Sequence, residues 1–355
     1  MCDMRTCFWD SKIQNGDNAV SLPWLLRCLG VLLLALLACV PAEAQCYVYV
    51  PTHKSNSVAV IDTTLDRVIA VIPVQVQPLS VAVSPDSAFA YVTNSGWIFG
   101  SNSVSVIDTA DNTVVATIPV GSFPVGVAFT PNGAFAYVAD MGSSDVSVIN
   151  TATRTEVARI GVGASPWGVA ITPNGAFAYV TNQGANSVSV INTATNSVVN
   201  TVSVGSNPAG VAITPNGAYA YVVNGSSGSV SVISTATNKV IATITVGGSP
   251  FTVAITPNGA RAYVTNAAAS STASSTVAVI DIPTNTVVTA VTVGTQPHGV
   301  AITPDGAFAY ISNFYNNSAS VIDTASNTVV DTIAGVALFP EAVGIALRPN
   351  ALRCR

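Results

Sequence analysis

Residues 166–205 read PWGVAITPNGAFAYVTNQGANSVSVINTATNSVVNTVSVG, and close variants of this stretch recur through most of the chain. Each copy contains one tyrosine in the same context, and successive tyrosines are 42 to 47 residues apart. These marker residues are Tyr49, Tyr91, Tyr137, Tyr179, Tyr221, Tyr263 and Tyr310. A repeat of this length that fills the chain predicts a repeat architecture with seven units.

The unit contains four short strand candidates separated by turn residues. Residues 172–175 read TPNG, which places proline second in a turn and glycine where φ is positive. Residues 192–196 read NTATN, whose side chains suit a second turn. Residues 187–191 alternate small and large side chains, as a strand with a two-residue period requires. No helix-period pattern separates the units, so a parallel sheet built from strand–helix–strand units is not expected.

Four strands in about 42 residues are typical of a propeller blade, whereas leucine-rich repeats are shorter and helical repeats lack such turns. The sequence therefore predicts an all-β, seven-bladed β-propeller with four antiparallel strands per blade. Small residues that alternate with Val, Ile and Tyr fit blades packed face to face.

The two ends of the repeat array complement each other. Residues 47–50, 57–62 and 68–74 match the second, third and fourth strands of a blade, and residues 343–347 match a lone first strand. We therefore expect one closing blade shared by both chain ends, because a closed ring removes the exposed strand edges that an open stack would leave. Alignment of the repeats places Cys46 and Cys354 near each other and predicts a disulfide; two free thiols are the alternative.

The first residues resemble an export signal. An apolar stretch, residues 28–40, follows Arg27 and precedes PAEAQ at 41–45, which favours cleavage after Ala44. Residues 36–39 (LLAC) also match a lipoprotein signal that ends at Ala38 and leaves a lipid anchor on Cys39, and an uncleaved anchor is a third option. The predicted domains are a signal peptide at 1–44 and a single propeller at 45–355. We expect an extracytoplasmic protein, secreted, periplasmic or at the cell surface, with no transmembrane span in the mature chain.

Composition excludes one class of partner. Without residues 1–44 the chain has nine Lys or Arg against thirteen Asp or Glu, a net charge of −4, and no basic run. Because nucleic-acid binding needs clustered basic residues, general nucleic-acid binding is not expected.

The motif AYVTN occurs intact at 90–94, 178–182 and 262–266. In this context, with PNG before it and VSVI after it, the chain resembles the YVTN family of β-propeller repeat proteins over about residues 46–350. That resemblance implies an exported seven-bladed propeller like those of archaeal surface layers and of bacterial periplasmic or surface proteins. The family has no single catalytic motif, and the variants at 48–52, 136–140 and 309–313 do not threaten the fold.

Propellers bind ligands mostly at one mouth of the central channel, so the middle residue of the inter-blade Pro-x-Gly loop is a candidate site position. Across the blades this position varies while its neighbours repeat, and the closing blade adds Glu341 in a longer loop. The position holds Leu79, Val125, Trp167, Ala209, Phe251, His298 and Val343. Such a ring either builds an asymmetric ligand site or plugs the channel.

Two loops between second and third strands are expanded, at 95–103 and 267–276. Trp97, Ile98 and Phe99 in the first loop either cover the mouth, meet a partner, or pack onto the neighbouring blade.

His53 and His298 are the only histidines, and alignment places both on the mouth face near Glu341. Two histidines and a carboxylate are possible ligands of a divalent metal. We nevertheless expect no cofactor and no metal, since isolated surface histidines are common.

Enzyme signatures such as G-x-S-x-G, H-E-x-x-H, a P-loop and C-x-x-C are absent from the sequence. Asp62, Asp108, Asp281 and Asp323 occupy a repeat position where other blades have Asn, which indicates a turn-capping role. Asp140 replaces the motif Asn, and we interpret it as a neutral replacement. These patterns favour an exported scaffold or binding protein, with a protein or cell-envelope partner on one ring face, over the alternative of a lactonase-like enzyme or metal-dependent binder centred on His298 and Glu341.

Overall fold

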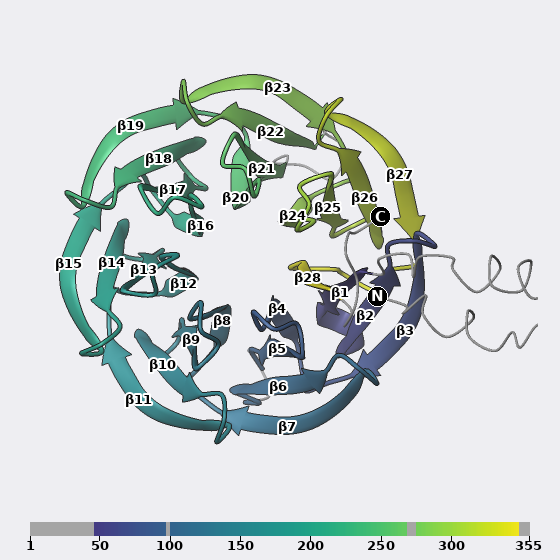
Figure 1. The fold of residues 1–355 in the computed structure, drawn as a ribbon, viewed down its shortest axis with the longest axis horizontal. Helices are drawn as coiled ribbons and strands as arrows, with labels where there is room; N and C mark the ends of the chain where they lie inside the picture. The colour runs from purple at the N-terminus through teal and green to yellow at the C-terminus, as the bar shows by residue number, and fades with distance from the viewer. Residues whose placement is uncertain (1–45, 97–99, 268–274, 348–355) are drawn as a thin grey trace, which may run out of the picture. The chain divides into compact units, whose positions relative to one another are not determined.

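The computed structural model describes residues 46–96, 100–267 and 275–347, and its strands form seven four-stranded antiparallel sheets. The sheets stand around a central axis as the blades of a propeller, each with its first strand innermost (Figure 1). The innermost strands are β4 (Pro78–Val83), β8 (Pro124–Phe129), β12 (Pro166–Ile171), β16 (Pro208–Ile213), β20 (Ser249–Ile255), β24 (Pro297–Ile302) and β28 (Gly344–Leu347). The predicted fold class is confirmed.

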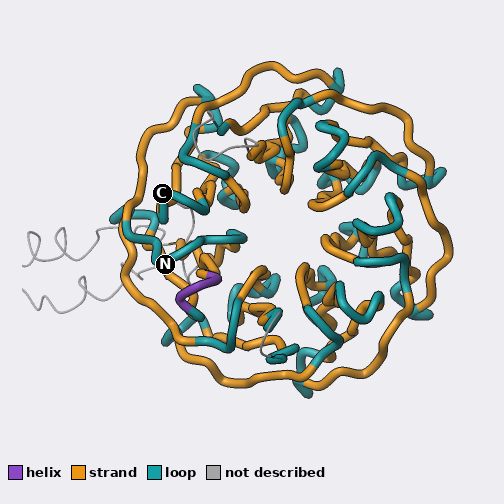
Figure 2. The backbone as a smooth tube through the Cα atoms, turned by 180° about the vertical axis from the view of Figure 1, so that it is seen from behind, coloured by secondary structure: helices purple, strands orange, loops and turns teal. Residues whose placement is uncertain are grey.

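The other strands follow in order towards the rim. The second strands are β1 (Cys46–Thr52), β5 (Phe89–Asn94), β9 (Phe135–Asp140), β13 (Phe177–Asn182), β17 (Tyr219–Asn224), β21 (Arg261–Ala267) and β25 (Phe308–Asn313). The third strands are β2 (Ser57–Asp62), β6 (Ser103–Asp108), β10 (Asp145–Asn150), β14 (Ser187–Asn192), β18 (Ser229–Ser234), β22 (Thr276–Asp281) and β26 (Ser318–Asp323). The outermost strands are β3 (Arg67–Pro73), β7 (Thr113–Pro119), β11 (Thr155–Gly161), β15 (Ser197–Ser203), β19 (Lys239–Thr245), β23 (Thr286–Thr292) and β27 (Thr328–Ala334). One 3-10 turn, η1 (His53–Ser55), joins β1 to β2 and is the single purple segment in Figure 2.

Both ends of the described chain build the closing blade, as the sequence predicted. Its strand order is β28-β1-β2-β3, with Gly344 opposite Tyr49 and Leu347 opposite Cys46. Cys46 is fully buried and disulfide-bonded. Cys354 lies outside the described residues, so the Cys46–Cys354 pairing stays a prediction.

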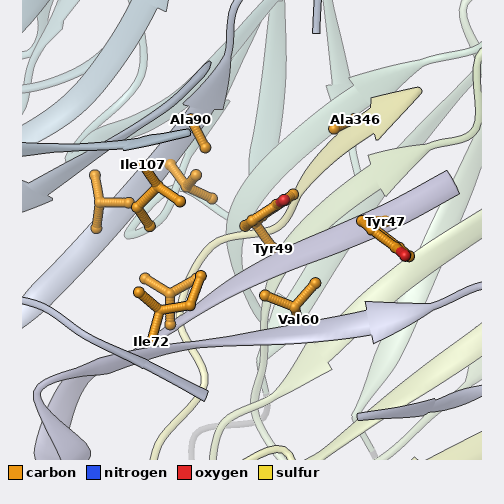
Figure 3. Close-up of a cluster of buried hydrophobic side chains, with 10 residues drawn as sticks. Tyr47, Tyr49, Val60, Ile72, Ala90, Ile107 and Ala346 are labelled. Atoms are coloured by element: carbon orange, nitrogen blue, oxygen red, sulfur yellow. The ribbon is translucent and has the colours of Figure 1, made fainter. Parts of the chain in front are cut away.

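The hydrophobic core is divided between the interfaces of neighbouring blades. In the cluster of Figure 3, Tyr49 and Ile72 of the closing blade pack with Ala90 and Ile107 of the next blade. The same pairing of a large and a small residue recurs where Tyr179 packs with Ala220. This complementarity explains why tyrosine and alanine recur at fixed positions, since each blade supplies one bulky and one small face.

The marker tyrosines also make polar contacts between blades. The Tyr179 hydroxyl donates to Asn238 Oδ1 at 2.6 Å, and Tyr221 donates to Asn285 in the same way. Each acceptor Asn has a positive φ in the turn between a third and an outermost strand. The hydroxyls of Tyr179 and Tyr221 are therefore satisfied across the blade interface.

The predicted capping role of the repeat Asp and Asn residues is confirmed. Asp62 Oδ1 accepts the backbone N–H of Thr64 at 2.8 Å, and Asn192 Oδ1 accepts that of Ala194 at 3.0 Å. No helix in the described part of the chain is long and apolar enough to cross a membrane. The predicted signal peptide lies outside the described residues.

Candidate functional site

A β-bulge at the start of the innermost strands directs the variable ring position towards the channel mouth. In the β12–β13 ladder, Pro166 pairs with Asn182 and Val169 pairs with Val180, so Trp167 and Gly168 together face Thr181. Bulges of this kind redirect a side chain at the end of a ladder. The Pro-x-Gly segment is thus part of the innermost strand, which corrects its prediction as an inter-blade loop.

The motif threonine fixes this bulge and joins it to the next blade. Thr181 Oγ1 accepts the N–H of Gly168 at 2.8 Å and donates to the carbonyl of Ala209 at 2.6 Å. Thr265 Oγ1 donates to the carbonyl of His298 at 2.9 Å, and Ser312 Oγ donates to that of Glu341. The backbone at Ala209 and His298 is therefore held by the preceding blade, as is that at Glu341.

The mouth contains a cavity of about 450 Å³, within the usual size of small-molecule sites. Its lining is mostly apolar, with a few polar groups on one side. The lining residues are His53, Gln77, Leu79, Ser95, Phe123, Val125, Met141, Trp167, Phe251, His298 and Glu341. A second cavity of about 250 Å³, lined by the innermost strands, shares Trp167 and Phe251 with the first.

The predicted ring residues do not all line the same cavity. Leu79, Val125, Trp167, Phe251 and His298 line the mouth cavity, and Val343 lines the second cavity. The Ala209 side chain is buried and lines neither cavity among the described residues. Trp97, Ile98 and Phe99 lie outside the described residues.

Aromatic rings form a continuous row across the mouth. Trp167 meets Phe251 edge-on, with centroids 5.7 Å apart and planes at 76°. His298 is stacked between Phe251 at 4.5 Å and Phe314 at 4.4 Å. Phe314 in turn contacts Phe339, over which the Lys54 ammonium lies 4.3 Å from the ring centroid. This row holds His298 on both faces and exposes only its edge to a ligand.

Glu341 lies between the two histidines. Its Oε2 is 2.8 Å from His298 Nδ1, and its Oε1 is 3.7 Å from His53 Nδ1. A carboxylate only accepts hydrogen bonds, so the His298 Nδ1 carries the proton and Nε2 is the acceptor on the neutral ring. Burial lowers the pKa of His53, which the Glu341 charge only partly offsets. His53 is therefore neutral at pH 7.

The polar cluster does not have the form of a metal centre. Zinc ligands lie about 2.0–2.2 Å from the ion, whereas here a carboxylate oxygen faces the Nδ1 of His298 directly at hydrogen-bond distance. Among the residues that the structure describes, no set of three or more His, Cys, Asp or Glu has a geometry that holds a metal.

Sequence reasoning found only His53 of a second variable ring, formed by the residue after the motif Asn or its equivalent, Thr52. In this ring Met141 lines the cavity and Phe314 stacks on His298. Phe123, just before a ring proline, also lines the cavity and has a φ of 53°. Variation among blades at these positions was the available signal, since Met141 and Phe314 correspond to Gln183 and Gly225 elsewhere.

Asp140 is not the neutral replacement that the sequence suggested. It is fully buried, and burial raises its pKa to about 7 even though hydrogen bonds from Ser147 favour the charged form. Ser147 Oγ lies 2.6 Å from both Asp140 Oδ2 and Glu156 Oε1, yet a hydroxyl has only one proton to donate. In its protonated form Asp140 can supply the second proton, just as the amide of Asn182 donates to Ser189 Oγ in its own blade.

Part of the chain matches a known family. Residues 161–240 match the model of the lactonase family of seven-bladed β-propellers, and no curated protein matches the chain. This match spans β12 to β18 and includes Trp167, but it ends at the start of β19 and does not reach His298 or Glu341. Membership of the YVTN family stays a prediction.

Solved structures share the fold. A putative 6-phosphogluconolactonase from Bacteroides fragilis is similar at TM-score 0.73 and 18% identity, covering 86% of this chain and 98% of that one. The hydrazine synthase of Kuenenia stuttgartiensis is similar at TM-score 0.67 and 23% identity, covering 75% and 89%. A functionally unknown protein from Desulfotomaculum acetoxidans has TM-score 0.70 at 18% identity, covering 85% and 98%. At these identities the likeness shows the propeller fold of this chain alone.

Proposed function

We propose that the protein is an exported binding protein that holds a small organic ligand in the mouth cavity of its propeller. The observation that carries this proposal is the cavity itself: a hollow of about 450 Å³ with Trp167 and Phe251 as perpendicular walls and Glu341 with His298 at one side. Apolar walls with a few convergent polar groups are the usual composition of small-molecule sites. A ring position that only plugged the channel would leave no such hollow.

The disulfide on Cys46 supports an extracytoplasmic location, because disulfides persist in oxidising compartments. Secreted, periplasmic and surface-bound forms fit equally, and the lipid anchor on Cys39 stays a prediction. A protein or cell-envelope partner also stays a prediction, for which exposed Tyr315 and Leu338 beside the aromatic row offer contact area.

Titration with N-phenyl-1-naphthylamine, an uncharged fluorophore that brightens in apolar pockets, tests the proposal. We expect saturable binding at one site per chain, and a loss of at least about tenfold in affinity for Trp167→Ala, because a buried aromatic wall commonly contributes more than 1 kcal/mol. Asn174→Ala is the control, since Asn174 caps a turn beyond the other end of β12. Equal affinity in the wild type and Trp167→Ala would refute a site at the mouth.

Hydrolysis of a lactone is a second candidate, favoured by the partial lactonase match together with the His298–Glu341 contact. In this candidate Glu341 orients His298, whose Nε2 takes a proton from water as the water oxygen attacks the lactone carbonyl. The same proton then passes to the ring oxygen that leaves as the hydroxyl of the hydroxy acid. Removal of a general base costs about 10²- to 10⁴-fold in rate.

A pH-stat assay with δ-valerolactone tests the second candidate. The expected result is acid release that His298→Gln abolishes and Asn174→Ala leaves intact. Acid release at the uncatalysed rate by the wild type, or an equal rate in His298→Gln, would remove this candidate and leave the binding proposal in place.

A further inference from the structure

We infer that the ligand of the mouth cavity is an organic cation: an ammonium group on an apolar or aromatic body. This inference rests on the binding function proposed above and names the chemistry that the cavity would select. Three properties of the lining residues support it, namely their charge, their hydrogen-bonding groups and their aromatic faces.

The described lining residues include one carboxylate, and their only basic side chains are the two histidines. Glu341 is the one carboxylate, and no Lys or Arg is among the described residues that line the cavity. The nearby ammonium of Lys54 is directed at Phe339, at 4.3 Å from the ring centroid. His53, whose pKa is lowered by burial, does not compensate Glu341 at neutral pH. An anionic ligand such as a sugar phosphate would therefore meet a carboxylate and no Lys or Arg among the described lining residues.

Two side chains of the lining, Glu341 and His298, offer hydrogen-bond acceptors. Glu341 offers carboxylate oxygens, and the neutral form of the His298 ring offers Nε2, because its Nδ1 is directed at Glu341. An N–H donor on a ligand can bond to these acceptors. Ammonium groups have up to three such donors.

The aromatic walls of the cavity also suit an organic cation. The ring planes of Trp167 and Phe251 meet at 76°, so the two rings form adjacent walls of the cavity. A cation near an aromatic face is attracted by the ring quadrupole, and tryptophan is the strongest such partner. The same walls offer apolar contact to the body of the ligand.

Three small ligands of one shape separate the possible chemistries: 2-phenylethylammonium, 2-phenylethanol and phenylacetate. Each would be measured by isothermal titration calorimetry and by displacement of bound N-phenyl-1-naphthylamine at pH 7.5. We expect the ammonium ion to bind about tenfold more tightly than the alcohol, and phenylacetate to bind most weakly. Glu341→Gln should bring the ammonium ion and the alcohol to within about threefold, since the charge is lost while the shape is kept.

Asp305→Asn is the matched control, because it removes one exposed carboxylate at a turn where other blades already have Asn. It should keep the preference for the ammonium ion. Phenylacetate binding as tightly as the ammonium ion would overturn the inference, as would a preference that survives in Glu341→Gln. If N-phenyl-1-naphthylamine binds the mouth but the ammonium ion does not displace it, the inference fails while the binding function stands. If neither binds, both fail.

Discussion

The Nδ1 of His298 lies 2.8 Å from Oε2 of Glu341, although the two residues are 43 positions apart and Glu341 lies in the segment that leads into the closing blade. The carbonyls of both residues accept hydrogen bonds from side chains of the blades that precede them. The contact therefore depends on the closed ring, since each partner is positioned by a neighbouring sheet.

This contact predicts the tautomer of His298. At pH 8 the neutral ring should carry its proton on Nδ1, because Glu341 accepts from that atom, whereas free histidine side chains favour Nε2–H. Two-bond ¹H–¹⁵N NMR correlations distinguish the tautomers, and a His53→Gln variant assigns the signals because the chain has two histidines. Glu341→Ala should return His298 to the Nε2–H form. An Nε2–H tautomer in the wild type would be incompatible with the contact.

The buried carboxyl of Asp140 predicts a pH-dependent stability. Its pKa is about 7 in the folded protein, above the value of 3.8 in the unfolded chain, so the folded state binds more protons between these values. The free energy of unfolding should therefore fall as the pH rises from about 4 to 7 and stay low above that range. Asp140→Asn, which restores the amide of the other blades, should be more stable at pH 8 by up to about 4 kcal/mol.

Urea unfolding at pH 5 and pH 8 measures this difference. The gap between Asp140→Asn and the wild type should widen towards pH 8, while Asp305→Asn at the surface should show no such widening. A constant gap at both pH values would mean that Asp140 is ionised throughout the folded state.

The contact between Tyr179 and Asn238 predicts a measurable coupling between blades. Tyr179→Phe should lower the free energy of unfolding by about 1 kcal/mol, because it removes one buried hydrogen bond. Asn238→Gly completes a double-mutant cycle, since glycine tolerates the φ of 50° at that position. Tyr219→Phe is the control, because Phe135, Phe177 and Phe308 occupy that position in other blades. A coupling energy near zero between Tyr179 and Asn238 would show that their hydrogen bond does not stabilise the folded protein.

The disulfide of Cys46 predicts a covalent closure of the ring. A non-reducing peptide map should link Cys46 to Cys354, and reduction should destabilise the propeller by about 5 kcal/mol in the chain-entropy model for so long a loop. The Cys46→Ser/Cys354→Ser double variant should unfold at the same temperature with and without reductant. A link from Cys46 to a cysteine of residues 1–44 would contradict this closure.

The fold was predictable because the same strand and turn patterns recur in seven repeat units. Turn residues such as Pro173 and Gly175, and alternation at 187–191, recur in register, so strand order and the shared closing blade follow from local chemistry. The tyrosines were recognised as markers, but their bonds to Asn of the following blade were not, because neighbouring units are related only by the three-dimensional ring.

The site was predictable in part for the same reason. Alignment placed Trp167, Phe251 and His298 at one mouth, and the longer loop pointed to Glu341. Phe314 and Met141 share the repeat position of His53, and they were missed because the variation at that position was not compared across the blades. The pKa of Asp140 was also hidden, since its burial depends on how the segment at Gly121 packs over it.

A crystal structure of the protein with N-phenyl-1-naphthylamine bound tests the central claim most directly. The account predicts electron density for the fluorophore in the mouth cavity, against the faces of Trp167 and Phe251 and beside Glu341. Density on the exposed valines of the outermost strands, with the mouth cavity free of ligand, would contradict it.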